Sequence, residues 1–475
     1  MPLDCVAATW FMIPPVQENN KPNVRYKEET METKLDSYHL PVTGRNILRF
    51  AFPTIVMTVF NTFYTMVDGL FVSNLIGMEA LSAINLTAPA IALITAISGM
   101  LATGGSAVVM KKMGEDKEQE ARQDFTLLIL TNAVVGAVMM LLGYTLMDRL
   151  LGAMDLSPAV FGYCRTYLSN YLLFTIPILL MYNFSLYLIA ADQSTLSLIC
   201  TVTGGVTNII LDYALISLFD LGIQGAAIAT GLGYSITAVV GFLVFRKKDS
   251  LLHFERPVFR GKVLFHASTN GMSELATSLV SGITTLLFNL AMLKYVGEDG
   301  VAAITIIMYV LMFVSALFIG YSYGVAPMIS YYYGERNHEK LKKLVGFSVK
   351  FIVGASVLCT VISILATIPL VGIFTRLDSP VYKLAVTGNR LCSIALLFVG
   401  LNVFASGMFT ALSNGVVSAV LAFSRSFLFT VASIQIMPVL LGGVTGVWLA
   451  TPVAELLGTV MAAALLLKYR KRYGY

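Results

Sequence analysis

The chain has 475 residues, of which 57% are hydrophobic and only 12% are charged, whereas about 25% are charged in an ordinary globular protein. Together with a mean hydropathy of +0.77, this excludes a set of soluble domains and predicts an all-α membrane protein with many spans. The formal net charge of +5 indicates no nucleic-acid partner, because the basic residues flank apolar runs, where they set orientation.

The first 45 residues are polar and lack a signal-like apolar core, so we interpret 1–45 as a flexible cytoplasmic tail, with Met1 and Met31 both open as the start. Twelve apolar runs follow, each long enough for a helix to cross a bilayer. They cover 47–75, 80–110, 125–148, 160–190, 195–218, 224–245, 264–294, 300–332, 342–374, 381–411, 415–441 and 444–467.

Lysine and arginine gather in the connections 111–124, 246–262 and 334–343 and in the tail 468–475. If the helices alternate in direction, these four segments lie on one side of the membrane, and the opposite connections hold few basic residues. The positive-inside rule then places both termini in the cytoplasm. We expect a multi-pass protein of the cell membrane.

An internal repeat divides the chain. Gly77 and the residues after it match Gly297 and its followers at a separation of 220 residues, and Gly222-x-x-Gly225 matches Gly443-x-x-Gly446 at 221. Each half holds six spans, so both halves enter from the same side and should be related by a pseudo-two-fold axis along the membrane normal. The expected domains are an N-lobe at 46–245, a linker at 246–262, a C-lobe at 263–467 and a basic tail at 468–475.

Two carboxylates lie inside apolar runs of the first half, Asp68 in the first run and Asp212 in the fifth, with Asn208 one helical turn before Asp212. A carboxylate at membrane depth is costly and normally faces the bundle interior or a wet cavity. Asp68 precedes Gly77 by nine residues and Asp212 precedes Asp220 by eight, which is ~12 to 14 Å at the helical rise. We therefore expect the two to meet at one depth.

The second half lacks such a pair. Asp68 corresponds to Phe288 at a separation of 220, and Asp212 corresponds to Ser433 at 221. This asymmetry favours ion or proton coupling over a purely structural role, although a helix–helix hydrogen bond stays an alternative.

The segment from Met66 to Val72, the Asn208-x-x-x-Asp212 pair and the glycine-rich run that begins at Gly443 resemble the multidrug and toxic compound extrusion (MATE) family, within the larger multidrug/oligosaccharidyl-lipid/polysaccharide exporter superfamily. The resemblance covers about residues 45–470. It implies a two-lobe exporter with twelve transmembrane helices, which exchanges amphiphilic, often cationic compounds for protons or sodium ions by alternating access.

The resemblance also implies roles for single residues. It assigns ion or proton coupling to Asp68, Asn208 and Asp212, and a hinge of the first helix to Pro53, where a backbone hydrogen bond is missing. A candidate substrate cavity is formed by polar residues inside the apolar runs, namely Asn183, Glu274, Asn289 and Asn402.

The sequence predicts no enzyme, because no nucleophile–base constellation and no metal-ligand spacing occur in it. We expect no cofactor except the coupling proton or sodium ion, and no metal beyond sodium at Asp68, Asn208 and Asp212. The expected partners are small organic substrates and membrane lipids. We expect the protein to be a monomer. The alternatives are a lipid-linked oligosaccharide flippase, which should line its cavity with several basic residues, and a passive channel.

Overall fold

The computed structural model describes residues 36–475; the first 35 residues of the tail expected at 1–45 lie outside the described residues, and the rest of that tail includes the short helix α2 and the start of α3. Within 36–475 the regular elements are helices. Those of the first half are α2 (Asp36–His39), α3 (Gly44–Leu75), α4 (Met78–Gly114), α5 (Glu118–Gly152), α6 (Pro158–Leu173), α7 (Thr175–Ala190), α8 (Ser194–Asp212), the π-helix η2 (Tyr213–Leu218) and α9 (Gly222–Arg246).

The second half begins after an extended connection. Its elements are α10 (Gly261–Asn270), α11 (Met272–Tyr295), α12 (Glu298–Gly334), α13 (His338–Leu365), α14 (Thr367–Gly372), α15 (Pro380–Cys392), the 3₁₀-helix η3 (Ser393–Ala395), α16 (Leu396–Ala411), α17 (Gly415–Phe423), the π-helix η4 (Ser424–Phe429), α18 (Thr430–Leu441) and α19 (Gly443–Tyr473).

The membrane-spanning prediction is confirmed. Eleven helical spans in the described part of the chain are long and apolar enough to cross a bilayer, and α6 with α7, bent by 56°, forms a twelfth. The helices begin where the sequence supplies caps: the side chains of Thr43, Ser157 and Ser379 accept hydrogen bonds from the first turns of α3, α6 and α15. Large apolar side chains such as Leu141, Leu365 and Val439 stand at the outer surface, 65%, 77% and 78% exposed, as a lipid-facing surface requires.

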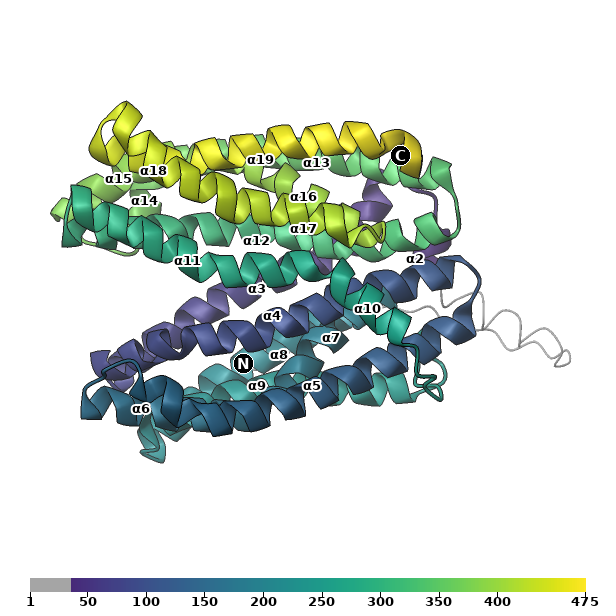
Figure 1. Ribbon diagram of the computed structural model, residues 1–475, viewed down its shortest axis with the longest axis horizontal. Coiled ribbons are helices and arrows are strands. Elements are labelled where there is room, and N and C mark those ends of the chain that lie inside the picture. The colour runs from purple at the N-terminus through teal and green to yellow at the C-terminus, as the bar shows by residue number, and fades with distance from the viewer. Residues whose placement is uncertain (1–35) are drawn as a thin grey trace, which may run out of the picture.

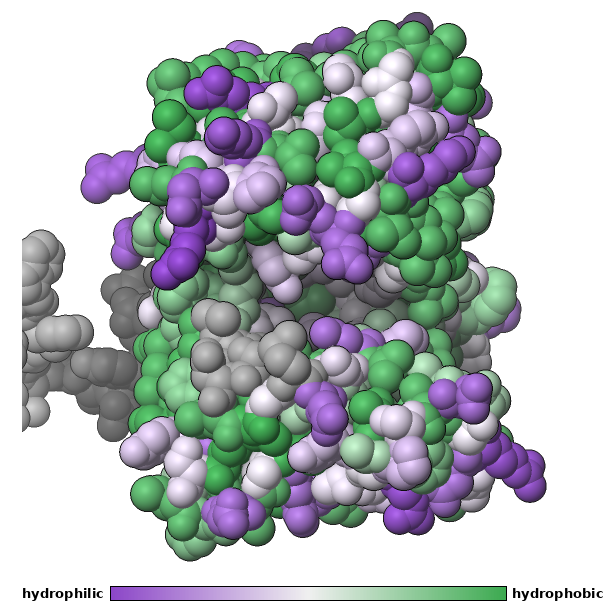
Figure 2. Space-filling view, turned by 90° about the vertical axis from the view of Figure 1, so that its left-hand side faces the viewer, coloured by the Kyte–Doolittle hydropathy of each residue, from purple (hydrophilic) through white to green (hydrophobic). Residues whose placement is uncertain are grey.

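The twelve spans form two lobes (Figure 1). One contains α3 to α9 and the other α10 to α19, and both α2 and the C-terminus lie at the same end of the bundle. We call this the terminal end. The lobes are joined there, and the view from the opposite end shows a hollow between them (Figure 2).

The repeat is visible in the backbone itself. Non-glycine residues with positive φ are uncommon, and four of the six in the described part of the chain fall at equivalent corners of the two halves. The matched pairs are Asp116 (59°) with Arg336 (56°), and Asp192 (61°) with Ser413 (57°), while Gly222 (52°) matches Gly443 (51°).

Glycines close the terminal end. A Cβ at Gly114 would lie 2.9 Å from the carbonyl carbon of Tyr331, and a Cβ at Gly334 would lie 2.9 Å from the carbonyl carbon of Lys111. These two contacts are equivalent under the repeat, since each residue in one is 220 positions from its counterpart in the other. Backbones of α4 and α12 therefore touch directly, because neither helix carries a side chain at this crossing.

The same kind of contact corrects the expected register of the first span of each half. Gly104 approaches Ala267, and its repeat equivalent Gly324 approaches Ala51. The separation of Ala51 and Ala267 is 216 residues, one helical turn less than the 220 that holds in α4 and α12. This register holds near the terminal end, whereas Gly77 and Gly297, both with positive φ, keep the separation of 220 at the other end, so Asp68 still corresponds to Phe288. The second half still has no carboxylate at this position.

Candidate functional site

The two carboxylates of the first lobe lie together because α3 packs closely on α8. Gly205 in α8 allows the rings of Phe60 and Tyr64 to approach, since a Cβ there would stand 2.8 Å from one and 3.4 Å from the other. One turn beyond Tyr64, the carboxyl group of Asp68 comes within hydrogen-bonding reach of Asp212. An oxygen of each, Oδ1, has no hydrogen-bond partner in the described part of the protein.

A third helix completes the group. A Cβ at Gly204 would lie 2.7 Å from the carbonyl oxygen of Gly233, so α8 and α9 cross in direct contact. This crossing brings Asn208 against Thr230. The amide orientation that satisfies its neighbours directs Asn208 Nδ2 to Asp212 Oδ2 at 3.2 Å, and the Asn208 oxygen accepts from the Thr230 N–H at 3.0 Å. The Asn208 and Asp212 side chains are fully buried.

Tyrosines surround the pair. Tyr64 of α3 and Tyr234 of α9 are within hydrogen-bonding reach of each other, and Asp68 acts electrostatically on both. Tyr167 and Tyr171 of α6 stand behind them with 4% and 2% of their surface exposed. Salt bridges among the described residues do not involve Asp68 or Asp212. The site is therefore an acidic pair, with Asp212 buried and Asp68 half-buried, that has polar neighbours and, among the described residues, no salt-bridged cation.

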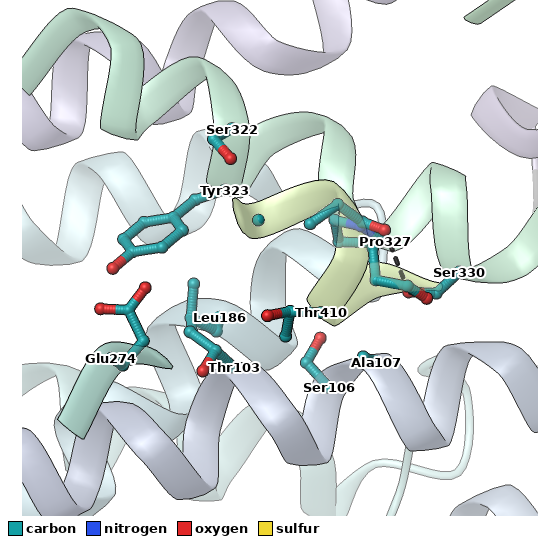
Figure 3. Close-up of a pocket in the computed structure, with 13 residues that line it drawn as sticks. Thr103, Ser106, Ala107, Leu186, Glu274, Ser322, Tyr323, Pro327, Ser330 and Thr410 are labelled. Carbon is teal, nitrogen blue, oxygen red and sulfur yellow. Dashed lines mark hydrogen bonds between the residues drawn. The ribbon is translucent and has the colours of Figure 1, made fainter. Parts of the chain in front are cut away.

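The centre of the molecule contains a cavity of about 210 Å³, separate from the acidic pair. Both lobes line it: Asn61 and Tyr182 come from the first lobe, and Glu274 and Tyr323 from the second. The carboxylate of Glu274 points to the hydroxyl of Tyr323 (Figure 3). Tyr182 also neighbours Tyr234, which in turn neighbours Asp68, so two tyrosines connect the central cavity to the acidic pair.

Inside the second lobe, a charged cluster joins three helices. Arg425 Nη1 lies 3.4 Å from Glu455 Oε1, and Asn402 Nδ2 donates to Glu455 Oε2 at 2.7 Å. Thr459 donates to Asn402 Oδ1 at 3.0 Å. Asn402 is thus fully engaged in this network, and Arg425 extends from it to a small cavity that Glu274 also lines.

The other predicted site residues are dispersed. Asn183 is buried within the first lobe and exchanges hydrogen bonds of 2.9 and 3.1 Å with Asn132, so it does not line the central cavity. Asn289 is half-buried on α11, also outside the residues that line that cavity. Pro53 lies within the unbroken helix α3.

Sequence analysis did not name Thr230, Tyr64, Tyr234 or Tyr323 as site residues. In the sequence, Thr230 is notable only because it matches Thr451 in the internal repeat. A tyrosine in an apolar run is ordinarily explained by the membrane interface. Helix crossings at glycine bring these side chains to the site, and a single sequence does not specify which helices cross.

Comparison with known proteins places this arrangement in a family. The MatE family profile matches residues 53–214 and 275–434, which is most of both lobes. The multidrug export protein MepA of Staphylococcus saprophyticus is 23% identical over 438 residues, covering 90% of this chain and 94% of MepA. MepA of Staphylococcus haemolyticus is likewise 23% identical over 433 residues.

Solved structures have the same fold. A multidrug resistance MATE transporter in an outward-facing conformation superposes with a TM-score of 0.85 at 21% identity, covering 93% of this chain and 98% of that chain. A transporter of the wider superfamily from Pyrococcus furiosus superposes with a TM-score of 0.84 at 21% identity and the same coverage. The chain belongs to the MATE family of multidrug efflux transporters.

Proposed function

We propose that this protein is an antiporter that exports amphiphilic, often cationic compounds and takes up protons or sodium ions in exchange. The observation that carries the proposal is the contact of Asp68 with Asp212, each with an unpartnered oxygen. Two carboxylates in contact repel each other, so either one of them holds a proton or a cation lies between them. The pair therefore has to bind one or the other.

The donors around the pair suit either ion. A proton would be shared between the two carboxyl groups, with Asn208 Nδ2 donating to Asp212. A sodium ion, as a hard cation, would take oxygen ligands, and the unpartnered Oδ1 atoms of Asp68 and Asp212 and the Thr230 hydroxyl are the oxygens at hand. Chemistry at the site is ion binding alone, without a covalent step.

Coupling follows from the position of the pair. The central cavity carries Glu274 and is acidic on its first-lobe side through the neighbouring pair, so it attracts an organic cation. Neutralising the pair with a proton or sodium removes part of that attraction. For exchange, the ion and the drug must prefer different states of the two lobes, and Pro53 is the position where α3 bends between those states.

The related MepA proteins are named multidrug export proteins, which supports export of organic compounds. Basic residues cluster at the terminal end, in the connections after α4, α9 and α12 and in the final turns of α19. By the positive-inside rule this end is cytoplasmic, in the cell membrane. The hollow at the opposite end then faces outward.

The test is ion-driven efflux of a fluorescent organic cation from proteoliposomes, with proton and sodium gradients imposed separately. Asp68→Asn and Asp212→Asn keep the size of each side chain and remove its charge, so each should abolish gradient-driven export while the protein still folds. Asp220→Asn is the matched control, since Asp220 is exposed eight residues beyond Asp212 and should leave export unchanged. The gradient that drives the wild-type protein identifies the ion.

Full gradient-driven export by both site variants would overturn the proposal. Transport by the wild type that no gradient affects would indicate a passive channel. Absence of cation transport, with movement of a lipid-linked oligosaccharide, would indicate a flippase.

A further inference from the structure

The repeat creates two equivalent positions at the terminal end, each with a cavity, and the described chain fills a larger part of one of them. In the more filled position, between α3, α8 and α12, the ring of Tyr38 packs on Phe50 and Tyr331 with centroid distances of 5.7 and 4.9 Å. Its hydroxyl donates to the carbonyl oxygen of Ala190 at 2.7 Å. Tyr38 is completely buried, so it narrows this position, and a cavity of about 330 Å³ remains beside Ser37 and Leu40.

The equivalent position lies between α10, α17 and α4 and holds a cavity of about 620 Å³. Here Lys111 replaces Tyr331, at the separation of 220, and His266 replaces Phe50, at the separation of 216. The two aromatic residues that pack on Tyr38, Phe50 and Tyr331, are thus replaced by a histidine and a lysine in the equivalent position. The exchange predicts an occupant with negative charge.

Two lysines, Lys111 and Lys262, line this cavity together with the carboxylate of Glu115. Lys262 has no salt bridge among the described residues and is exposed. Lys111 forms a long salt bridge of 3.9 Å with Glu115, which an anionic group can replace, and lies over the ring of Tyr333. Lys112 also lines the cavity, but its ammonium group pairs with Asp124 and Glu120. A phosphate group would bridge Lys111 and Lys262.

A buried acceptor specifies more of the ligand. Asn270 lines the cavity and is 4% exposed. Its Nδ2 donates to the Thr410 carbonyl oxygen at 2.8 Å, whereas its Oδ1 has no partner in the described structure. A buried carbonyl oxygen without a partner is uncommon. The ligand should therefore carry a hydrogen-bond donor, such as a hydroxyl, near its phosphate.

The rim of the cavity is apolar and exposed. Phe265 of α10 is 66% exposed and Val416 of α17 is 71% exposed, and Val420 and Phe423 continue the α17 face at 49% and 46%. Their spacing of four and three residues places them on one side of the helix. Since α17 begins and α4 ends at this level, the cavity lies where lipid headgroups meet the protein, and the apolar face extends towards the acyl chains.

We propose that this cavity binds an anionic phospholipid whose headgroup carries a hydroxyl, as phosphatidylglycerol does. The phosphate contacts Lys111 and Lys262, the headgroup hydroxyl donates to Asn270 Oδ1, and an acyl chain lies along Val416, Val420 and Phe423. Because Lys111 belongs to one lobe and Lys262 to the other, the bound lipid stabilises the joined terminal end. The lipid site is independent of ion coupling at Asp68 and Asp212.

Native mass spectrometry of the full-length, delipidated protein measures this binding with matched lipids. Phosphatidylglycerol should bind more tightly than phosphatidylethanol, which has the same charge but no headgroup hydroxyl, and both more tightly than phosphatidylcholine. In Lys111→Gln/Lys262→Gln the affinity for phosphatidylglycerol should fall about 30-fold, from two lysine contacts. The control is Lys247→Gln/Lys342→Gln, which removes two exposed lysines at the same end but outside the cavity and should bind as the wild type does.

Equal loss in the control variant would show a diffuse surface effect and overturn the site. Full displacement of the lipid by soluble glycerophosphoglycerol would show that a free phosphodiester is the ligand and overturn the assignment to a lipid. Equal binding of phosphatidylglycerol and phosphatidylethanol would refute the role of Asn270. Export driven by the ion gradient in liposomes that contain only phosphatidylcholine tests the transport function separately, because that function does not require this lipid.

Discussion

Replacing Gly114 and Gly334 with alanine should open the terminal end. A Cβ at either position would lie 2.9 Å from a facing carbonyl carbon and closer still to its oxygen, whereas ordinary contacts measure 3.4–4 Å. The helices α4 and α12 would have to separate by at least about 0.5 Å, and such overpacking costs about 1–3 kcal/mol. That energy lowers the ratio of joined to separated terminal ends by about 5- to 150-fold. The two substitutions share one crossing, so their effects should not add.

Distances between spin labels measure the effect directly. Labels at Gln119 on α5 and Lys342 on α13, in a variant without the native cysteines, report the separation of the lobes at the terminal end. Gly346→Ala is the matched control, because α13 begins at the same end and a Cβ at Gly346 would meet nothing within 4 Å. An unchanged distance distribution in Gly114→Ala/Gly334→Ala, or an equal change in the control, would refute the reasoning.

Three further outcomes are expected. Tyr38→Ala should shift the same distances towards separation, by loss of aromatic packing worth about 3–5 kcal/mol, whereas Tyr38→Phe loses only one hydrogen bond, about 1 kcal/mol. Thr230→Val removes a hydroxyl and should weaken export driven by a sodium gradient but not by a proton gradient, as measured in proteoliposomes. Arg425→Met leaves Glu455 without its salt-bridge partner and should lower stability by about 3–5 kcal/mol; thermal unfolding in detergent should show recovery when Glu455→Gln is added.

The spans were predictable because a bilayer leaves the chain few alternatives. Each apolar run must bond its backbone internally, so it becomes a helix of nearly fixed length. The expected runs at 47–75 and 80–110 appear as helices at Gly44–Leu75 and Met78–Gly114. The bend between α6 and α7 was not predicted, although the sequence carries a signal for it: Pro177, in the first turn of α7, lacks the N–H that would continue the helix across Phe174.

The expected meeting of Asp68 and Asp212 rested on two quantities that a sequence contains, the direction of each helix and the distance of each residue from its loop. Neither quantity states which helices touch. Thr230 and Tyr234 reach the pair because Gly204 and Gly233 face each other, and many other glycines in the chain have no such partner. Asn183 shows the converse: its polarity suggested a cavity, but Asn132 across the lobe satisfies it.

The contacts that join the two lobes follow the symmetry of the repeat, whereas the candidate ion-binding residues do not. At the terminal end, Gly114 and Gly334 make the same contact in both halves, so the closure is symmetric and either lobe contributes equally. Nearer the other end, the acidic pair has Phe288 and Ser433 as its counterparts, so this pair is confined to one lobe. In the exchange that we propose, the acidic pair and Glu274 both attract a cation in the central cavity, and a proton or sodium ion at the pair changes the first lobe alone. Coupling therefore requires α3 to respond relative to α12, which it contacts at Gly320 and Gly324, and substitutions at those contacts should alter transport without altering ion binding at Asp68.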